Sequence, residues 1–224
     1  METRNMAKGL HQVFVSKLMT LIGTILLTIS SVVVLVIAAA SISPEADLSG
    51  AMSGFAGATL AGLVLFFVSL ALLLLGLIFM MVGLGNASKD DDRFKTVLVF
   101  ALISLGCSIF SAFIPYIPAI YLNVPVLSQI LNLVSTVLDL LVVIMTITYT
   151  CDALAAKGRN DLAEKGANIL KLILVIIIIL LIVRIVVIFP VPIAAILTLV
   201  ALVLQIVYWF SFMIFLSKAS KALA

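Results

Sequence analysis

Charge is scarce in this sequence of 224 residues. Asp, Glu, Lys and Arg together make up 10% of it, hydrophobic residues make up 65%, and the mean hydropathy is +1.41. Soluble globular domains carry about a quarter charged residues, so the composition excludes a soluble enzyme or receptor domain and predicts an integral membrane protein. The net charge of +3 does not indicate a nucleic-acid partner, because in a membrane protein the positions of the charges matter more than their sum.

Metal ligands and reactive side chains are also few. The chain has one histidine, His11, and two cysteines, Cys107 and Cys151. Cys107 falls inside a predicted membrane span and Cys151 at the end of another, which is neither a disulfide framework nor the spacing of a metal site. The sequence therefore predicts two free thiols, no metal and no other cofactor.

The motifs of common catalytic centres are missing as well. The sequence contains no HExxH pair, no G-x-S-x-G turn and no phosphate-binding glycine loop with a lysine. The three aspartates at 90–92 lack the spaced oxygen ligands of a calcium loop and are flanked by Lys89 and Arg93, which predicts a solvated turn. We therefore expect no enzymatic activity and assign no catalytic residue.

Long apolar runs dominate what is present. A helix needs about 20 residues to cross a bilayer, and the sequence predicts six spans, at 14–40, 55–84, 96–113, 128–151, 169–189 and 193–216. A secretory signal peptide is the competing interpretation of the first run, but the run is longer than the ~7 to 15 residues of a signal-peptide core. We predict an all-α, polytopic helical bundle that forms a single membrane domain over residues 1–224.

The basic residues fall on one side of this predicted topology. They lie at the two ends of the chain and in the second and fourth connections, at Arg4, Lys8, Lys17, Lys89, Arg93, Lys95, Lys157, Arg159, Lys165, Lys171, Lys218 and Lys221. Only Arg184, inside the fifth span, lies toward the other side. By the positive-inside rule both termini are cytoplasmic, and we expect the protein in the plasma or inner cell membrane.

The fourth predicted span carries a polar stripe. At 100° per residue its polar side chains share about a third of the helix circumference, and they are Ser128, Gln129, Asn132, Ser135, Thr136, Asp139, Thr146 and Thr150. Hydrocarbon cannot satisfy such a stripe, so it must face protein or trapped water. Asn132, Thr136 and Asp139, with Gln205 and Tyr208 of the last span, form the candidate polar or transport site.

Asp139 lies near the middle of its span, where a charge is costliest. Three roles remain open: a coupling or proton-relay carboxylate, the partner of Arg184, or a protonated core residue hydrogen-bonded to Thr136 or Gln205. Arg184 can also reach the outer headgroups unaided, because it lies roughly 9 Å inside the boundary at helical rise. A second small polar face, typical of a packing surface, follows the third span at Ser104, Cys107, Ser108 and Ser111.

An internal repeat of three two-helix hairpins is suggested by self-comparison. Ser69, Asn132 and Thr198 coincide when residue numbers are shifted by 63 and then by 66, and Gly76, Asp139 and Gln205 then share the next level. If the repeat holds, the even-numbered spans turn these faces to one shared interior. In the second span the face consists of small residues at heptad spacing, as expected where another helix approaches closely: Gly62, Ser69, Gly76 and Gly83.

These patterns favour a non-enzymatic structural or accessory component of a membrane. The alternative is a small-solute or ion transporter, or a channel subunit, with a polar path around Asp139. The expected partners are the lipid bilayer and either further copies of the chain or another membrane protein.

Overall fold

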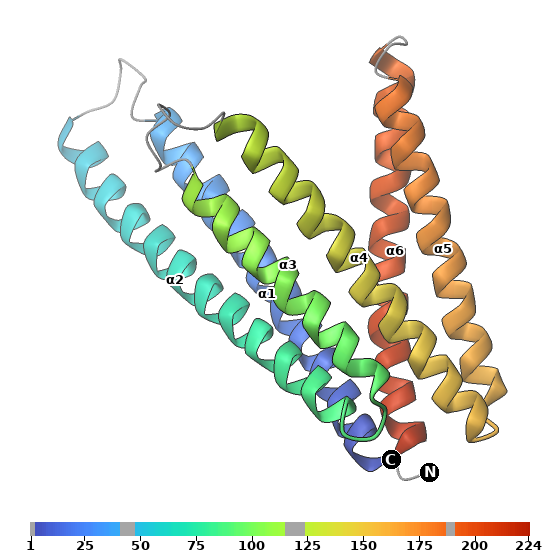
Figure 1. The fold of residues 1–224 in the computed structure, drawn as a ribbon. Helices are drawn as coiled ribbons and strands as arrows, with labels where there is room; N and C mark the ends of the chain where they lie inside the picture. Colours follow the sequence, from blue (N-terminus) through green and yellow to red (C-terminus); the bar gives the residue numbers. More distant parts are fainter. Residues whose placement is uncertain (1–2, 41–47, 115–123, 187–190) are drawn as a thin grey trace. The chain divides into compact units, whose positions relative to one another are not determined.

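The computed structural model describes residues 3–40, 48–114, 124–186 and 191–224. At some helix ends it describes the backbone alone, over residues 34, 37–40, 48–59, 112, 124–126, 180–186 and 191–198. The helices are α1 (Arg4–Ala40), α2 (Leu48–Ala87), α3 (Arg93–Phe113), α4 (Val124–Ala156), α5 (Asn160–Val186) and α6 (Val191–Leu223) (Figure 1). No strand occurs in the described parts of the chain, which confirms the predicted all-α bundle.

Five helices are long and apolar enough to cross a membrane over their described residues. These segments are Arg4–Val33, Leu60–Ala87, Arg93–Ser111, Leu127–Ala156 and Leu199–Leu223. The described side chains of α5 include Asp161, Glu164, Lys165 and Lys171, so its apolar part extends into residues 180–186, where only the backbone is described. The span predicted at 169–189 therefore stays a prediction. The other five segments define an integral membrane protein whose helices lie in a lipid bilayer.

The helices are longer than the predicted apolar spans. α1 begins at Arg4, α4 continues to Ala156 and α6 continues to Leu223. Hydropathy marks the part of a helix that hydrocarbon can surround, whereas the backbone hydrogen bonds of a helix continue equally well in water. Between α4 and α5 the chain turns at Gly158, whose φ of 74° is a left-handed conformation that glycine adopts without strain.

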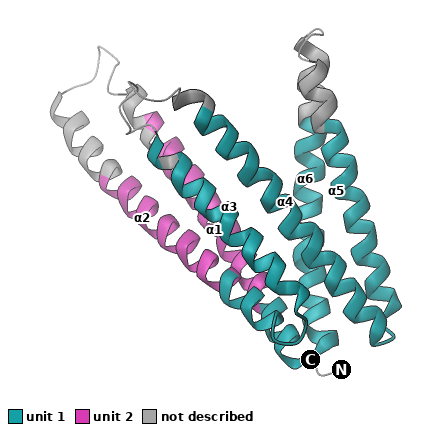
Figure 2. Ribbon diagram, in the orientation of Figure 1, with its two compact units in different colours: residues 1–11, 81–224 teal, residues 12–80 magenta. Residues whose placement is uncertain are grey.

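Residues 12–80 form one of two compact units (Figure 2). Within it α1 and α2 approach closely: a Cβ added at Gly23 would lie 3.1 Å from the Ser69 carbonyl oxygen, and Ser30 Oγ donates to the Gly62 carbonyl oxygen at 2.8 Å. Later residues of α1 meet earlier residues of α2, so the two helices are antiparallel. Small residues at the contact allow this approach, as in other membrane helix pairs.

Residues 1–11 and 81–224 form the other unit (Figure 2). In it α3 packs on α4, α5 packs on α6, and α4 also packs on α5 and, less extensively, on α6. Most of its fully buried apolar side chains lie where both ends of the chain lie, and they include Leu10, Phe94, Ile147, Leu154, Leu216 and Leu223. We call this the basic end, comprising residues 3–11, 86–95, 149–165 and 217–224. Farther along the helices large apolar side chains are exposed, among them Phe110 and Leu133, as expected for lipid-facing surface.

Candidate functional site

The polar stripe of α4 packs against the small polar face of α3, and we call this contact the α3–α4 seam. It consists of Ser104, Ser108 and Ser111 of α3 and Ser128, Asn132, Ser135 and Asp139 of α4. Each set recurs at intervals of three or four residues and so occupies one helix face. Ser104 meets Asp139 and Ser111 meets Ser128, which makes the pair antiparallel.

Hydroxyl groups satisfy one another along the seam. Ser104 Oγ lies 3.0 Å from Ser135 Oγ, and Ser108 Oγ lies 2.7 Å from the same atom. One to two turns away, Ser111 Oγ lies 3.1 Å from Ser128 Oγ and donates to Asn132 Oδ1 at 3.0 Å. No buried side-chain nitrogen or oxygen of the described residues lacks a hydrogen-bond partner. The seam therefore holds two helices together with hydrogen bonds that hydrocarbon could not replace.

Asp139 stands at the edge of this seam. Ser104 Oγ donates to Asp139 Oδ1 at 2.5 Å, so its partner is neither Thr136 nor Gln205. Ser104 is 3% exposed, whereas the Asp139 side chain is among the exposed ones. Thr136 donates to the Asn132 carbonyl oxygen of its own helix at 2.7 Å, and Thr136 and Asn132 are exposed as well.

The last two residues of the predicted site lie apart from these three. Gln205 is exposed on α6, and no hydrogen bond joins it to α4 in the described part of the chain. Tyr208 is half-buried and stacks on Phe212 of its own helix, with ring centroids 6.0 Å apart. Away from the basic end α4 diverges from α5 and α6 (Figure 1). The side chain of Arg184, the other expected partner of Asp139, lies outside the described residues.

The small residues of α2 lie against α1. In residues 12–80, a Cβ added at Gly76 would lie 2.9 Å from Thr20 Oγ1 and 3.1 Å from the Ser16 carbonyl oxygen. In the other unit, a Cβ added at Gly9 would clash with the Gly83 carbonyl oxygen and lie 2.7 Å from the Ala87 backbone nitrogen. Both positions bring one helix backbone close to its neighbour.

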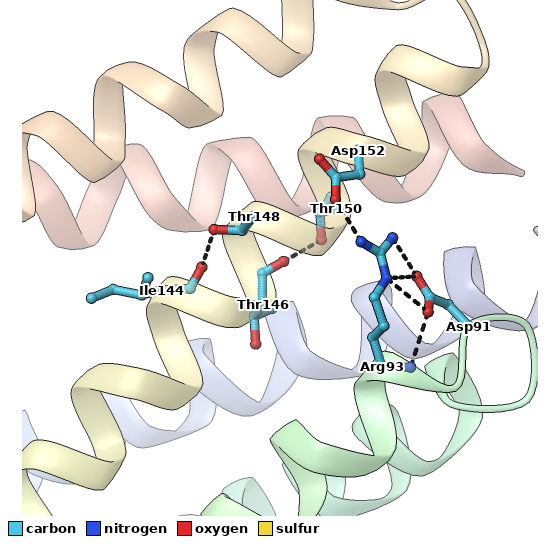
Figure 3. A network of polar contacts seen from close by, with 7 residues as sticks. All are labelled: Asp91, Arg93, Ile144, Thr146, Thr148, Thr150 and Asp152. Atoms are coloured by element: carbon cyan, nitrogen blue, oxygen red, sulfur yellow. Dashed lines mark hydrogen bonds and ion pairs between the residues drawn. The ribbon is translucent and has the colours of Figure 1, made fainter.

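At the basic end, Arg93 joins groups that the sequence analysis left separate (Figure 3). Its guanidinium pairs with Asp91 Oδ2 at 2.9 Å and with Asp152 Oδ2 at 2.6 Å, and it lies 4.7 Å from the centre of the Tyr149 ring. Arg93 thus connects the turn before α3 to the last turns of α4. Charge-assisted pairs and cation–π contacts of this kind stabilise an arrangement of helices.

The turn at 90–92 is solvated at Asp92, as predicted, but Asp90 and Asp91 are half-buried. Asp90 accepts hydrogen bonds from the Met6 backbone N–H at 2.7 Å and from Asn5 Nδ2 at 2.8 Å, which places a carboxylate at the start of α1. Burial raises the pKa of Asp91, but the hydrogen bonds and charge of Arg93 outweigh it, and the pKa lies below its usual value. The contacts of Asp91 with Arg93 and of Asp92 with Lys95 are local, whereas the contact of Asp90 with the start of α1 is distant in sequence and no local pattern could reveal it.

Chemically, the seam offers hydroxyl groups, one amide and one carboxyl. No histidine or second carboxylate accompanies Asp139 among the described contacts, and no group of three His, Cys, Asp or Glu side chains in the described residues could hold a metal ion. The helices and the seam define an all-helical integral membrane protein. Comparison with protein-family models, with characterised proteins and with solved structures gives no match for this chain.

Proposed function

We propose that the protein is a non-enzymatic structural or accessory component of a membrane. The observation that supports this role is the α3–α4 seam, in which the hydroxyls of Ser104, Ser108 and Ser135 bond to one another. An aqueous path would leave such groups available to water or a solute. Their mutual pairing favours adhesion between helices instead.

The proposal includes a topology with several membrane crossings and both termini in the cytoplasm. It rests on the basic residues that gather at one end, where the N-terminal segment and the end of α6 also meet. Thr3 Oγ1 donates to the Leu223 carbonyl oxygen at 2.7 Å, and Lys157 Nζ donates to the same oxygen at 2.7 Å. In the plasma or inner membrane of a cell, a basic end of this kind faces the cytoplasm.

Accessibility of the seam to a water-soluble thiol reagent tests both parts of the proposal. In a background with Cys107 and Cys151 replaced by Ala, single cysteines are placed at Ser135 in the seam and at Ser88 in the turn of the basic end. Membranes are then treated with a membrane-impermeant maleimide from each side. We expect no labelling at Ser135, and labelling at Ser88 from the cytoplasmic side alone.

Labelling of the cysteine at position 135 from either side would contradict a seam from which water is excluded. Labelling of Ser88 from the outer side alone would contradict the proposed orientation and leave the seam result intact. Cysteine at Leu133, which is 66% exposed on the apolar surface, serves as the matched control for a lipid-facing position of the same helix and is expected to stay unlabelled.

A transporter or channel subunit is the second candidate, and the exposure of Asp139 favours it. Asn132, Thr136 and Asp139 are exposed polar side chains in the middle of α4, and hydrocarbon is a poor environment for them. They need either protein from a second copy or another membrane protein, or water in a path. Under the transport hypothesis that water carries protons or a small solute.

Proton flux into proteoliposomes distinguishes these alternatives. Vesicles holding a pH-sensitive dye receive a potassium diffusion potential, and the rate of acidification is compared with that of protein-free vesicles. The transport hypothesis predicts flux that Asp139→Asn abolishes and that Asp152→Asn, at the basic end, leaves intact. Equal rates with and without protein would remove proton transport through Asp139 from the candidate functions.

A further inference from the structure

A groove runs between α5 and α6 from the basic end toward the membrane interior. Its volume is about 380 Å³, and its deeper part is lined by Ile169, Leu172, Ile214 and Phe215. This volume lies within the range of ordinary ligand sites. Phe215 and Ile169 are buried, whereas Ile214 is 53% exposed, so the groove is open along the surface of the helix pair.

The mouth of this groove is strongly basic. Lys165 and Lys218 line it, and an adjoining hollow that shares these two lysines adds Arg159, Asp161 and Lys221. Four basic side chains thus face one acidic side chain, an excess of three positive charges. The hydrogen bond from Arg159 Nε, at 3.3 Å, lowers the pKa of Asp161, and the charge of Lys165 acts in the same direction. Asp161 therefore interacts with Arg159 and Lys165, and Lys218 and Lys221 remain.

The lysines of the mouth are available to a ligand. Lys218 and Lys221 make no hydrogen bond or ion pair with the described residues, and both are exposed, as is Lys165. Other lysines of the basic end differ: Lys95 pairs with Asp92 at 2.7 Å, and Lys89 donates to Asn86 Oδ1 at 3.1 Å. Arg4 and Lys8 of the basic end are likewise exposed, but they line neither hollow, so Lys218 and Lys221 are the ones that bring unpaired positive charge to the groove.

The basic and apolar parts of the groove lie at different levels along α5 and α6. Leu172 follows Lys165 by seven residues in α5, and Ser211 precedes Lys218 by seven in α6, so the groove extends roughly 10 Å from its lysines at helical rise. α5 and α6 run in opposite directions, which places both lysines at the same end. Asn168 lies on the wall between the two parts and offers an amide there.

We propose that this groove binds an anionic phospholipid, with its phosphate between Lys165, Lys218 and Lys221 and an acyl chain along Ile169, Leu172 and Ile214. Positive charge at the headgroup level attracts anionic lipids, and the apolar extension matches an acyl chain but not a free phosphate ion. The site requires that the helices lie in a bilayer and does not depend on the structural or transport role proposed above.

Native mass spectrometry of the full-length protein tests this site. The protein is delipidated in a neutral detergent and then given equal amounts of phosphatidylglycerol and phosphatidylcholine with identical acyl chains. We expect more phosphatidylglycerol than phosphatidylcholine to bind. Each lysine near a membrane surface contributes a factor of about five to anionic lipid binding, so Lys218→Gln with Lys221→Gln should lower the preference by about 25-fold.

A matched variant separates a defined site from general surface charge. Lys89→Gln with Lys95→Gln removes the same charge from the same end of the protein outside the groove, and its lipid preference should stay within about twofold of the original. An equal loss in both double variants, or equal binding of the two lipids by the unmodified protein, would overturn the proposal.

Two further measurements distinguish a bound lipid from a bound free anion. Ser211→Phe places a large side chain in the apolar part and should reduce phosphatidylglycerol binding without changing the charge. Inorganic phosphate added to the unmodified protein should not displace the lipid. Displacement by phosphate would reassign the groove to a soluble anion, and this arm remains decisive if Ser211→Phe does not fold.

Discussion

Replacement of Gly9 by alanine probes a close contact between the α1 and α2 backbones in the larger unit. The added Cβ would clash with the Gly83 carbonyl oxygen and lie 2.7 Å from the Ala87 backbone nitrogen, where ordinary contacts begin at 3.4 Å. Both neighbours belong to the backbone of α2, so no side chain can rotate to make room. α1 and α2 must therefore separate by about 0.7 Å or more at this point.

The two opposing effects of the substitution have known sizes. Alanine in place of glycine favours the helix by roughly 0.5 to 1 kcal/mol, and overpacking of a close contact costs roughly 1 to 3 kcal/mol. Gly9→Ala should therefore lower the free energy of unfolding by about 1 to 2 kcal/mol. For a chain of this size that corresponds to a Tm about 2 to 8 °C lower.

Gly85→Ala is the matched control, since no atom lies within 4 Å of a Cβ added there. It gains the same helix propensity without a clash and should raise the Tm by about 1 to 4 °C. Both variants are heated in detergent, and the remaining monodisperse protein is measured by size-exclusion chromatography. A Gly9→Ala protein as stable as the unmodified one would refute the close contact. An equal fall in Tm for Gly9→Ala and Gly85→Ala would refute the assignment of this contact to Gly9.

Two further predictions concern polar contacts. Ser104→Ala removes the donor to Asp139 and should lower the free energy of unfolding by about 0.6 to 1.7 kcal/mol. The Ser31 hydroxyl donates to the Leu27 carbonyl oxygen of its own helix, so Ser31→Ala should change this free energy little. Equal effects of the two variants in the same melting assay would contradict a stabilising role of the seam. Arg93→Ala should cost about 0.5 to 1 kcal/mol, because its side chain is 47% exposed and solvent screens its ion pairs. Burial raises the pKa of Asp91, but Arg93 lowers it more, so the pKa lies below 3.8. The stability that the pair of Arg93 and Asp91 contributes is therefore complete above pH 3.8 and is lost as the pH falls through the lowered pKa. The difference in Tm between the two proteins should narrow as the pH falls from about 6 through the lowered pKa of Asp91, and a difference that does not change with pH would contradict the assignment.

The helices were predictable because their signal is local. An apolar run of about 20 residues indicates a helix in lipid whatever its neighbours are, and five such helices occur in the described residues. The two polar faces were visible for the same reason: Ser104 to Ser111 and Ser128 to Asp139 each follow helical spacing. Their mutual pairing was not predicted, because periodicity shows which face of a helix is polar but does not show which neighbour it meets.

The aspartates at 90–92 show the opposite case. Their sequence context, between Lys89 and Arg93, is that of a solvated turn, and nothing nearby indicates that Asp90 reaches the first turn of α1 at Met6. The same holds for the contact between Arg93 and Asp152, 59 residues later. Such contacts depend on how the helices pack, which local propensity does not determine.

The contacts of the aligned residues bear on how the suggested repeat is interpreted. Gly76 lies against Ser16 and Thr20 of α1, and Asp139 bonds to Ser104 of α3. The aligned faces of α2 and α4 thus meet the preceding helix of their own hairpin, whereas Gln205, at the same level of α6, is exposed. The sequence argument for transport was the mid-span carboxyl of Asp139, and its hydrogen bond to Ser104 of the same hairpin favours adhesion between these two helices. Under the structural role that we propose, the exposed edge of Asp139 is a polar surface in lipid that a second chain would cover.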